Sequence, residues 1–99
     1  MLYAIIAADR PNSVEARKSV RPRHMEYIRP LVEAGRIVLA GPHPAVDIAE
    51  PTVEGMTGSL IVAEFESLDA AREWAAHDPY LTDGVFADVQ IKPFIQVVP

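Results

Sequence analysis

The order of extended and helical patterns is the feature that most limits what this chain can fold into. Four segments show the alternating or continuous apolar pattern of strands, and two others show apolar residues at helical spacing. We expect strands at about 2–8, 36–40, 59–66 and 85–92, and helices at about 21–34 and 68–77. The order strand, helix, strand, strand, helix, strand predicts an α+β fold, the ferredoxin-like βαββαβ sandwich, in which two helices cover one face of an antiparallel sheet.

The first helical region carries two prolines. Residues 12–15, Asn-Ser-Val-Glu, match a helix-capping pattern, so we expect a short helical turn that reaches about Lys18. The main helix should then begin near Arg21, where a proline in the first turn is tolerated. Pro30 lies inside this helix and removes one of its hydrogen bonds, which predicts a kink near Glu26.

The segments around the strands add further expectations. Residues 41–58 hold three prolines and three glycines without periodicity, so we expect a loop or an extended hairpin connection there, usually a functional feature at this length. Residues 80–84 should form a turn, and Pro93 favours a sheet edge or a bulge. The second and third strands are apolar on both faces, which predicts a homodimer in which a second copy covers the open face of the sheet.

Composition and charge limit the class of protein. At 99 residues with 49% hydrophobic content, we expect one domain, 1–99. The net charge of -5 argues against a nucleic-acid partner. No apolar run reaches the roughly 20 residues of a membrane span. The apolar N-terminal run lacks the basic leader of a signal peptide. The chain contains no cysteine. We therefore expect a cytoplasmic protein that uses no disulfide or thiolate chemistry.

His24 is the residue that most suggests chemistry. Because a helix turns about 100° per residue, His24 shares a helix face with Ile28 and Leu31, so its imidazole lies within the apolar stripe. A histidine in that place is either a satisfied core residue or part of a chemical site. His43, in a proline-flanked loop, is ordinarily a solvent-facing residue, and His77, at a helix end, is ordinarily structural.

Other kinds of site have little support. The histidines show no metal-ligand spacing, so we expect no metal. Residues 55–59 contain two glycines but lack the lysine and spacing of a nucleotide-binding loop, and nothing else suggests a cofactor. Ser59 lacks the strand-turn-helix context of a nucleophilic serine.

Asp78 is the partner we favour for His24. If the two meet, the carboxylate orients the imidazole and stabilises its cation, which leaves the other ring nitrogen as a general base or acid. We expect the two helices to run roughly parallel, so contact would require the kink, or the loop after the second helix, to fold back. From spacing alone, core and capping roles for the two residues are the more common alternative.

Several short motifs occur in order along the chain. They are Ser19-Val20-Arg21-Pro22-x-His24, Gly35-Arg36, Ala40-Gly41-Pro42, Gly58-Ser59, Glu64-Phe65-Glu66-Ser67, Asp78-Pro79-Tyr80 and Lys92-Pro93-Phe94. Together they resemble the YciI-like, or YCII-related, family over nearly the whole chain. The resemblance implies a ferredoxin-like fold that dimerises as in the dimeric α+β barrel superfamily, and an active site formed by His24 and Asp78.

The resemblance also suggests a reaction class. One branch of the family is linked to dehydrochlorination of a chlorinated hydroxyhydroquinone. We therefore expect a cofactor-independent acid/base enzyme, a lyase or isomerase, that acts on a compact anionic or phenolic metabolite, with His24 as base and Asp78 as its orienter. The residues expected to bind the ligand are Arg21 (or Arg23), Ser19, Ser59 and Tyr80. The alternatives are a non-catalytic ligand-binding or sensing module and a monooxygenase without haem or flavin.

Overall fold

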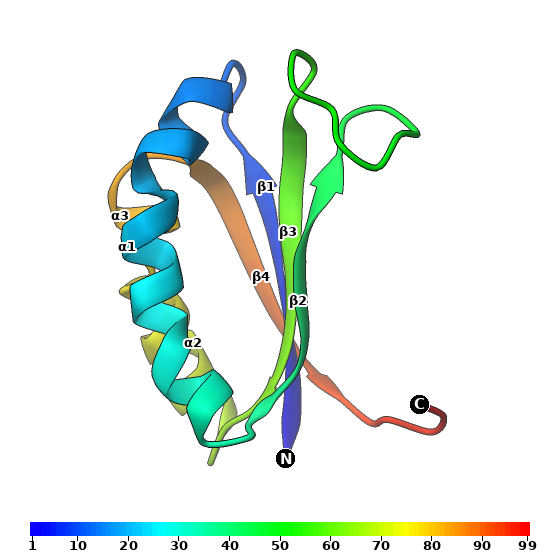
Figure 1. The fold of residues 1–99 in the computed structure, drawn as a ribbon. Coiled ribbons are helices and arrows are strands. Elements are labelled where there is room, and N and C mark those ends of the chain that lie inside the picture. Colours follow the sequence, from blue (N-terminus) through cyan, green and yellow to red (C-terminus); the bar gives the residue numbers. More distant parts are fainter.

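In the computed structural model, which describes residues 1–99, four strands form one sheet and the helices pack on it (Figure 1). The elements are β1 (Leu2–Asp9), α1 (Val14–Glu33), β2 (Ile37–Pro44), β3 (Met56–Glu64), α2 (Leu68–Ala76), α3 (Pro79–Thr82) and β4 (Phe86–Phe94). All neighbouring strands are antiparallel, and their order is β2-β3-β1-β4. The predicted ferredoxin-like βαββαβ sandwich is therefore confirmed.

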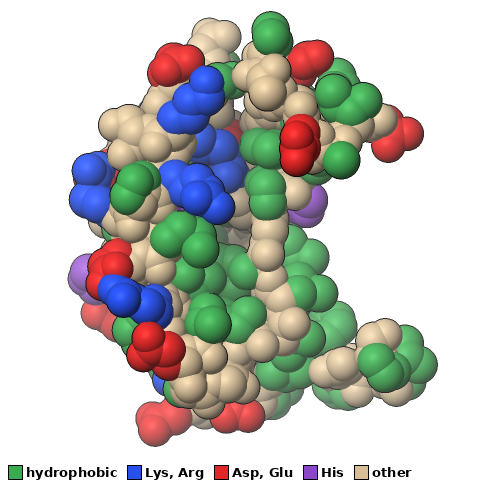
Figure 2. Space-filling view, in the orientation of Figure 1, with side chains coloured by type: hydrophobic (Ala, Val, Ile, Leu, Met, Phe, Trp, Pro, Cys, Tyr) green, Lys and Arg blue, Asp and Glu red, His purple; other side chains and the backbone are tan.

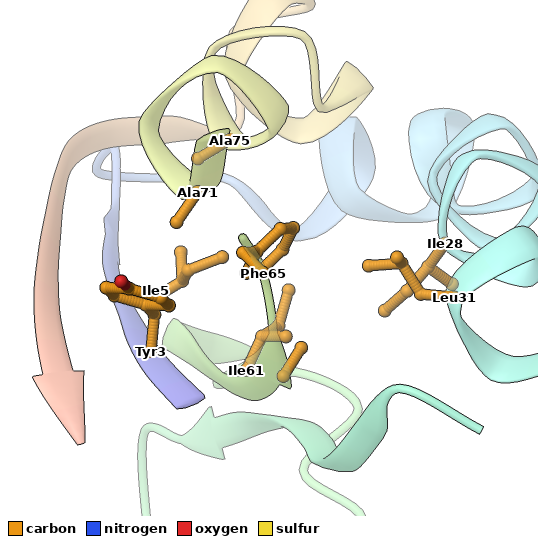
Figure 3. Close-up of a cluster of buried hydrophobic side chains, with 9 residues drawn as sticks. Tyr3, Ile5, Ile28, Leu31, Ile61, Phe65, Ala71 and Ala75 are labelled. Carbon is orange, nitrogen blue, oxygen red and sulfur yellow. The ribbon is translucent and has the colours of Figure 1, made fainter. Parts of the chain in front are cut away.

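The main core lies between the helices and the central strands (Figure 3). Side chains alternate along a strand, so Tyr3 and Ile5 of β1 point to the same face of the sheet. Ile28 and Leu31 of α1 are buried in the same cluster. The nine buried members are Tyr3, Ile5, Ile28, Leu31, Ile61, Ala63, Phe65, Ala71 and Ala75. This packing fixes the face of α1 that also carries His24, because residues four apart share a helix face.

α1 is one helix of 20 residues. It begins at Val14, and both Pro22 and Pro30 lie inside it. The prediction of a short turn followed by a helix from Arg21 was therefore wrong. Burial of one apolar face stabilises a helix more than a single missing hydrogen bond weakens it, which explains why the helix continues through its prolines.

The start of α1 also differs from the expected capping box. Ser13 is the residue before the helix, but its side chain caps no amide. Its hydroxyl instead donates to Asp9 Oδ2 over 3.0 Å. Asn12 has a positive φ of 59°, which suits the tight turn out of β1 rather than a cap. The Ser13 hydroxyl is therefore directed toward Asp9 and not toward an amide of α1.

β2 and β3 are longer than predicted, and their connection is shorter. β2 runs to Pro44 and β3 begins at Met56, so the connection comprises residues 45–55. The pairing extends from Ile37 opposite Ala63 to Pro44 opposite Met56. Backbone pairing with β3 holds the end of β2 extended although its sequence lacks strand periodicity.

Ser67 caps α2, since its Oγ accepts a hydrogen bond from the Ala70 amide over 3.0 Å. Of two expectations for the chain after α2, one is confirmed and one is wrong. β4 is an edge strand, as Pro93 indicated. Residues 80–82, expected as part of a turn, belong to the short helix α3 (Pro79–Thr82).

α1 and α2 run in opposite directions across the sheet (Figure 1). The prediction that they are roughly parallel was wrong. Each helix returns the chain along the strand that precedes it, and the preceding strands, β1 and β3, are antiparallel. The first half of α1 and the end of α2 consequently lie at the same end of the molecule, and no kink is needed to bring them together.

The second face of the sheet carries no helix (Figure 1). β2 is exposed along almost its whole length. The exposed large hydrophobic residues in β2, in the 45–55 connection and near the C-terminus are Val38, Leu39, Val46, Ile48, Val53, Phe94, Ile95, Val97 and Val98. No helix is both long and apolar enough to span a membrane.

Candidate active site

A cavity of about 790 Å³ lies between α1 and the strands β2 and β3. Figure 2 shows the surface hollowed beside α1, with Lys and Arg side chains gathered along the upper part of the helix. Arg17, Lys18 and Arg21 line the cavity, whereas Glu50 is its one acidic lining residue. A cavity with this balance of charge attracts anions.

His24 and Asp78 meet beside this cavity. His24 Nδ1 lies 2.9 Å from Asp78 Oδ1, and both residues are buried. The same Oδ1 accepts a hydrogen bond from the Tyr80 amide over 2.9 Å, which makes Asp78 the N-cap of α3. The proline at position 79 begins the short helix and so fixes the geometry of this cap. The contact that spacing left open is therefore present in the structure.

The hydrogen bond between the two residues defines the chemistry of the imidazole. A carboxylate only accepts hydrogen bonds, so the Nδ1–H of His24 is the donor and Nε2 carries a lone pair in the neutral ring. Nδ1 is the ring nitrogen with a protein partner. No buried side-chain nitrogen or oxygen lacks a partner, so Nε2 is accessible, and His24 lines the cavity.

Tyr80 forms the wall next to His24. The two rings are stacked with centroids 4.0 Å apart and planes 15° from parallel. Burial raises the pKa of the Tyr80 hydroxyl above its ordinary value of 10.0, and the Asp78 carboxylate adds to this effect. The charges of Arg17 and Arg21 and the hydrogen-bonding contact of Arg17 with the hydroxyl oppose it. The hydroxyl is therefore protonated near neutral pH and can donate a hydrogen bond.

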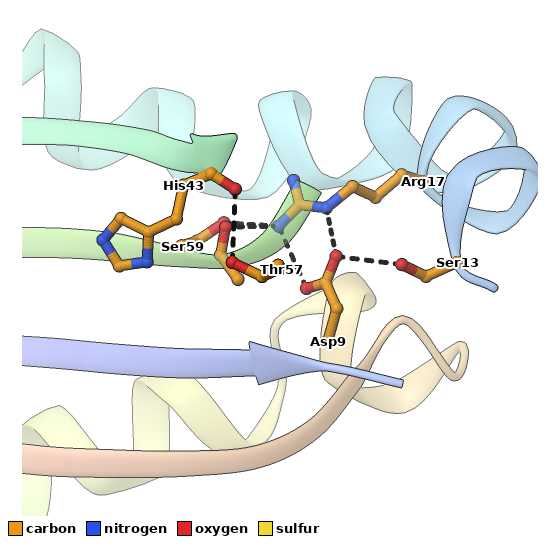
Figure 4. A network of polar contacts seen from close by, with 7 residues as sticks. Asp9, Ser13, Arg17, His43, Thr57 and Ser59 are labelled. Carbon is orange, nitrogen blue, oxygen red and sulfur yellow. Dashed lines mark hydrogen bonds and ion pairs between the residues drawn. The ribbon is translucent and has the colours of Figure 1, made fainter. Parts of the chain in front are cut away.

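Arg17 is held by a network that the sequence did not predict (Figure 4). Its Nε lies 2.6 Å from Asp9 Oδ2, and its Nη2 contacts Asp9 Oδ1, the Gly58 carbonyl and Ser59 Oγ at 3.1, 3.0 and 2.7 Å. The guanidinium also lies over the Tyr80 ring, 4.9 Å from its centre. The Asp9 side chain is 2% exposed and that of Arg17 is 12% exposed, so this is a largely buried ion pair.

Comparison with known proteins agrees with this architecture. A family model, the YCII-related domain, matches residues 1–95. The chain belongs to this family. It is 50% identical to Protein YciI of Escherichia coli O6:H1 over 97 residues, which cover 98% of this chain and 99% of that protein. The family resemblance seen in the motifs is thus confirmed.

Two further relatives of this YCII-related protein have more descriptive names. A benzaldehyde-derivative biosynthesis cluster protein C of Emericella nidulans is 37% identical over 71 residues, covering 68% of this chain and 69% of that protein. The structure of 5-chloro-2-hydroxyhydroquinone dehydrochlorinase, TftG, from Burkholderia phenoliruptrix was solved with 2,5-dihydroxybenzoquinone. It is 29% identical, with a TM-score of 0.85 and coverage of 96% of this chain and 94% of that one.

The structure brings some of the predicted site residues of this YCII-related domain together. Arg21, Ser59 and Tyr80 line the cavity with His24. Ser19 is exposed on α1 and does not line it. Ser59 is bound to Arg17, so its hydroxyl is part of the ion-pair network.

The remaining predicted candidates lie outside this group. Arg23 pairs with Asp83 at 2.6 Å on the surface and does not line the cavity. His43 is exposed in β2, and His77 Nδ1 contacts the Glu73 carbonyl at the end of α2. No group of three or more His, Cys, Asp or Glu side chains converges in a way that could hold a metal ion.

A second hollow, of about 750 Å³, lies between α1 and α2 and contains neither His24 nor Asp78. The Tyr27 hydroxyl donates to the Trp74 carbonyl over 2.7 Å, and the two aromatic rings stack. Burial raises the pKa of Tyr27 above 10.0, and the charges of Asp78 and Glu73 add to the effect. These contacts join α1 to α2.

Proposed function

We propose that this protein is an acid/base enzyme of the lyase or isomerase type that acts on a small hydroxylated metabolite without a cofactor. The observation that carries the proposal is the arrangement of His24, whose Nδ1 is bound to Asp78 while Nε2 is accessible at the cavity. A neutral imidazole held in this way is a general base aimed at a ligand.

The reaction needs only groups that the site holds. Nε2 takes the proton of a ligand hydroxyl, and the carboxylate of Asp78 stabilises the imidazolium that results. The electron pair of the broken O–H bond forms a carbonyl. In an elimination from a chlorinated hydroxyhydroquinone, the ring carbon that bears the chlorine gains a proton in this step and becomes saturated. A second ring hydroxyl then gives its proton to the base, its electron pair forms a second carbonyl, and chloride departs with its bonding pair. The ring loses one proton and one chloride overall, so no external oxidant or reductant is consumed.

The charges around the cavity support an anionic or phenolic ligand. Arg17, Lys18 and Arg21 are positioned to stabilise the oxyanion that forms when a hydroxyl loses its proton. The likeness to TftG, named as a dehydrochlorinase of a hydroxyhydroquinone, supports the same class of compound. Loss of chloride from such a ring is the reaction we propose to test first.

We also propose that the protein works as a homodimer. The open sheet face and the segments around it expose large hydrophobic side chains, among them Leu39 at 47% and Val97 at 86%. A second copy of the chain would cover this surface through a two-fold interface. The cavity lies on the other side of the sheet and stays open to ligands.

One experiment separates an enzyme from a binding module. Wild type, His24→Ala and His77→Ala are compared for chloride release from 5-chloro-2-hydroxyhydroquinone and for affinity toward 2,5-dihydroxybenzoquinone. Removing a general base should slow chloride release by about 100- to 10,000-fold, while the exposed His77 serves as the matched control. Equal release by wild type and His24→Ala would refute the proposed role. Tight binding with no release by any form would favour a binding module.

A further inference from the structure

We propose that Arg17 binds an oxygen anion of the ligand through its Nη1 nitrogen and so selects ligands that bear an acidic hydroxyl. This inference rests on the proposed function and names the group that recognises the substrate. The sequence favoured Arg21 for this purpose, and no local pattern singled out Arg17.

The first step of the argument is that Arg17 is rigidly held. Asp9 engages two of its nitrogens, and the Gly58 carbonyl and Ser59 Oγ share Nη2. The Tyr80 ring supports the guanidinium from one side. A guanidinium fixed in this way loses little conformational entropy when it binds a ligand.

The second step concerns the nitrogen that remains. The hydrogen bonds that Arg17 makes to Asp9, the Gly58 carbonyl and Ser59 run through Nε and Nη2. Figure 4 shows the third nitrogen without a dashed line and directed away from Asp9. Because no buried side-chain nitrogen lacks a partner, Nη1 is accessible, and Arg17 lines the cavity. Two N–H donors on one cationic group are thus available to a ligand.

The third step is the relation of Arg17 to the base. Tyr80 contacts both groups, since its ring stacks on His24 with centroids 4.0 Å apart and the Arg17 guanidinium lies over it at 4.9 Å. A ligand that contacts both His24 and Arg17 therefore spans the Tyr80 side chain. A planar ring with hydroxyl or oxo groups at separate positions meets this requirement, since one oxygen reaches Nε2 and another reaches Nη1.

The other lining cations differ from Arg17 in ways that make them poorer selectors. Lys18 and Arg21 are exposed, so water screens their charges. They are suited to attracting anions toward the cavity rather than to fixing one oxygen. Arg17 is mostly shielded from water, where a charge-assisted hydrogen bond is stronger.

The test compares two probes that differ in charge. The affinities of 2,5-dihydroxybenzoquinone and its neutral 2,5-dimethoxy analogue are measured by calorimetry. The proteins are wild type, the paired variant Asp9→Asn with Arg17→Gln, and Arg23→Gln. The paired variant leaves no unpartnered buried charge and keeps the net charge, and Arg23→Gln is a control that removes one guanidinium outside the cavity. Arg17→Lys, which keeps the ion pair with Asp9, is measured in case the paired variant does not fold.

We expect wild type and Arg23→Gln to prefer the dihydroxy probe by about 10- to 100-fold, the contribution of a hydrogen bond to a charged group. The preference should nearly vanish in the paired variant and fall in Arg17→Lys. An unchanged preference in both Arg17 variants, or no preference in wild type, would overturn the proposal. Chloride release is not part of this readout, so the proposed reaction and the role of Arg17 can fail independently.

Discussion

His24 and Asp78 are 54 positions apart in the chain, yet Nδ1 of one lies 2.9 Å from Oδ1 of the other. The antiparallel course of α1 and α2 brings them to the same end of the sheet (Figure 1). The cap of α3 then fixes the carboxylate through the Tyr80 amide. The Asp78 carboxylate therefore orients the imidazole of His24, and the Tyr80 amide at the start of α3 holds that carboxylate in place.

The Asp9–Arg17 ion pair should show strong thermodynamic coupling. Arg17→Gln alone leaves a carboxylate that is 2% exposed without its cation, and should lower the free energy of unfolding by about 3–5 kcal/mol. Adding Asp9→Asn should restore part of this loss. Urea denaturation measures both, and Arg23→Gln, which breaks an exposed pair, should cost less than about 1 kcal/mol. Additive losses in the double variant would contradict the coupling.

Gly58 should be intolerant of a side chain. A Cβ there would overlap the Ala7 carbonyl oxygen of the neighbouring strand, so Gly58→Ala must separate β1 from β3. We expect a loss of at least about 2 kcal/mol in the free energy of unfolding. Gly41→Ala is the matched control, since a Cβ at that position contacts nothing within 4 Å. Equal stability of the two variants would show that the strands do not approach this closely.

Stability should decline in alkali because the pKa values of Tyr80 and Tyr27 are raised above 10.0 by burial. Above pH 10 the unfolded state releases these protons while the folded state keeps them. The unfolded state then binds fewer protons, so the free energy of unfolding falls as pH rises. Below about pH 10 both states keep these protons, so these two tyrosines do not make the free energy of unfolding depend on pH. Tyr80→Phe should make the alkaline decline shallower in urea titrations at several pH values, and an unchanged slope would contradict its raised pKa.

The exposed sheet face should control assembly. At micromolar concentration the protein should sediment as a dimer or larger species, because a second copy removes apolar surface from water. Leu39→Glu places a charge on that face and should shift the population toward monomer. Val32→Glu, on α1 at the other side of the sheet, is the control with a similar change at an exposed site. A wild-type monomer under these conditions would refute the dimer.

The fold was largely predictable because its strands and helices carry clear periodic patterns. The direction of the helices was predicted wrongly although the βαββαβ order fixes it, because β1 and β3 are antiparallel and the helices that follow them run in opposite directions. The end of β2 was missed for another reason. Gly41 to Pro44 has no strand pattern, and pairing with β3 keeps it extended.

The candidate site was only partly visible in the sequence. His24 could be found because helical spacing places it among apolar residues. Asp78 was chosen because it ends the second helix and belongs to the Asp78-Pro79-Tyr80 motif of the family. Arg17 was visible only as one member of the basic cluster Arg17, Lys18, Arg21 and Arg23, which could serve a small anion but more commonly marks a solvated helix face. Its partner Asp9 ends a strand, and no local spacing links the two. One available signal was Asp9 itself. It closes an apolar strand, and a buried carboxylate at that place needs a cation nearby.

The central claim is that Asp78 holds His24 in the tautomer that leaves Nε2 free to accept a proton. Nitrogen-15 NMR of the histidine ring, at a pH where the imidazole is neutral, measures this directly. We expect the proton on Nδ1 and an unprotonated Nε2 in wild type, and loss of this preference in Asp78→Asn, whose amide can donate to Nδ1. A proton on Nε2 in wild type would contradict the proposed base.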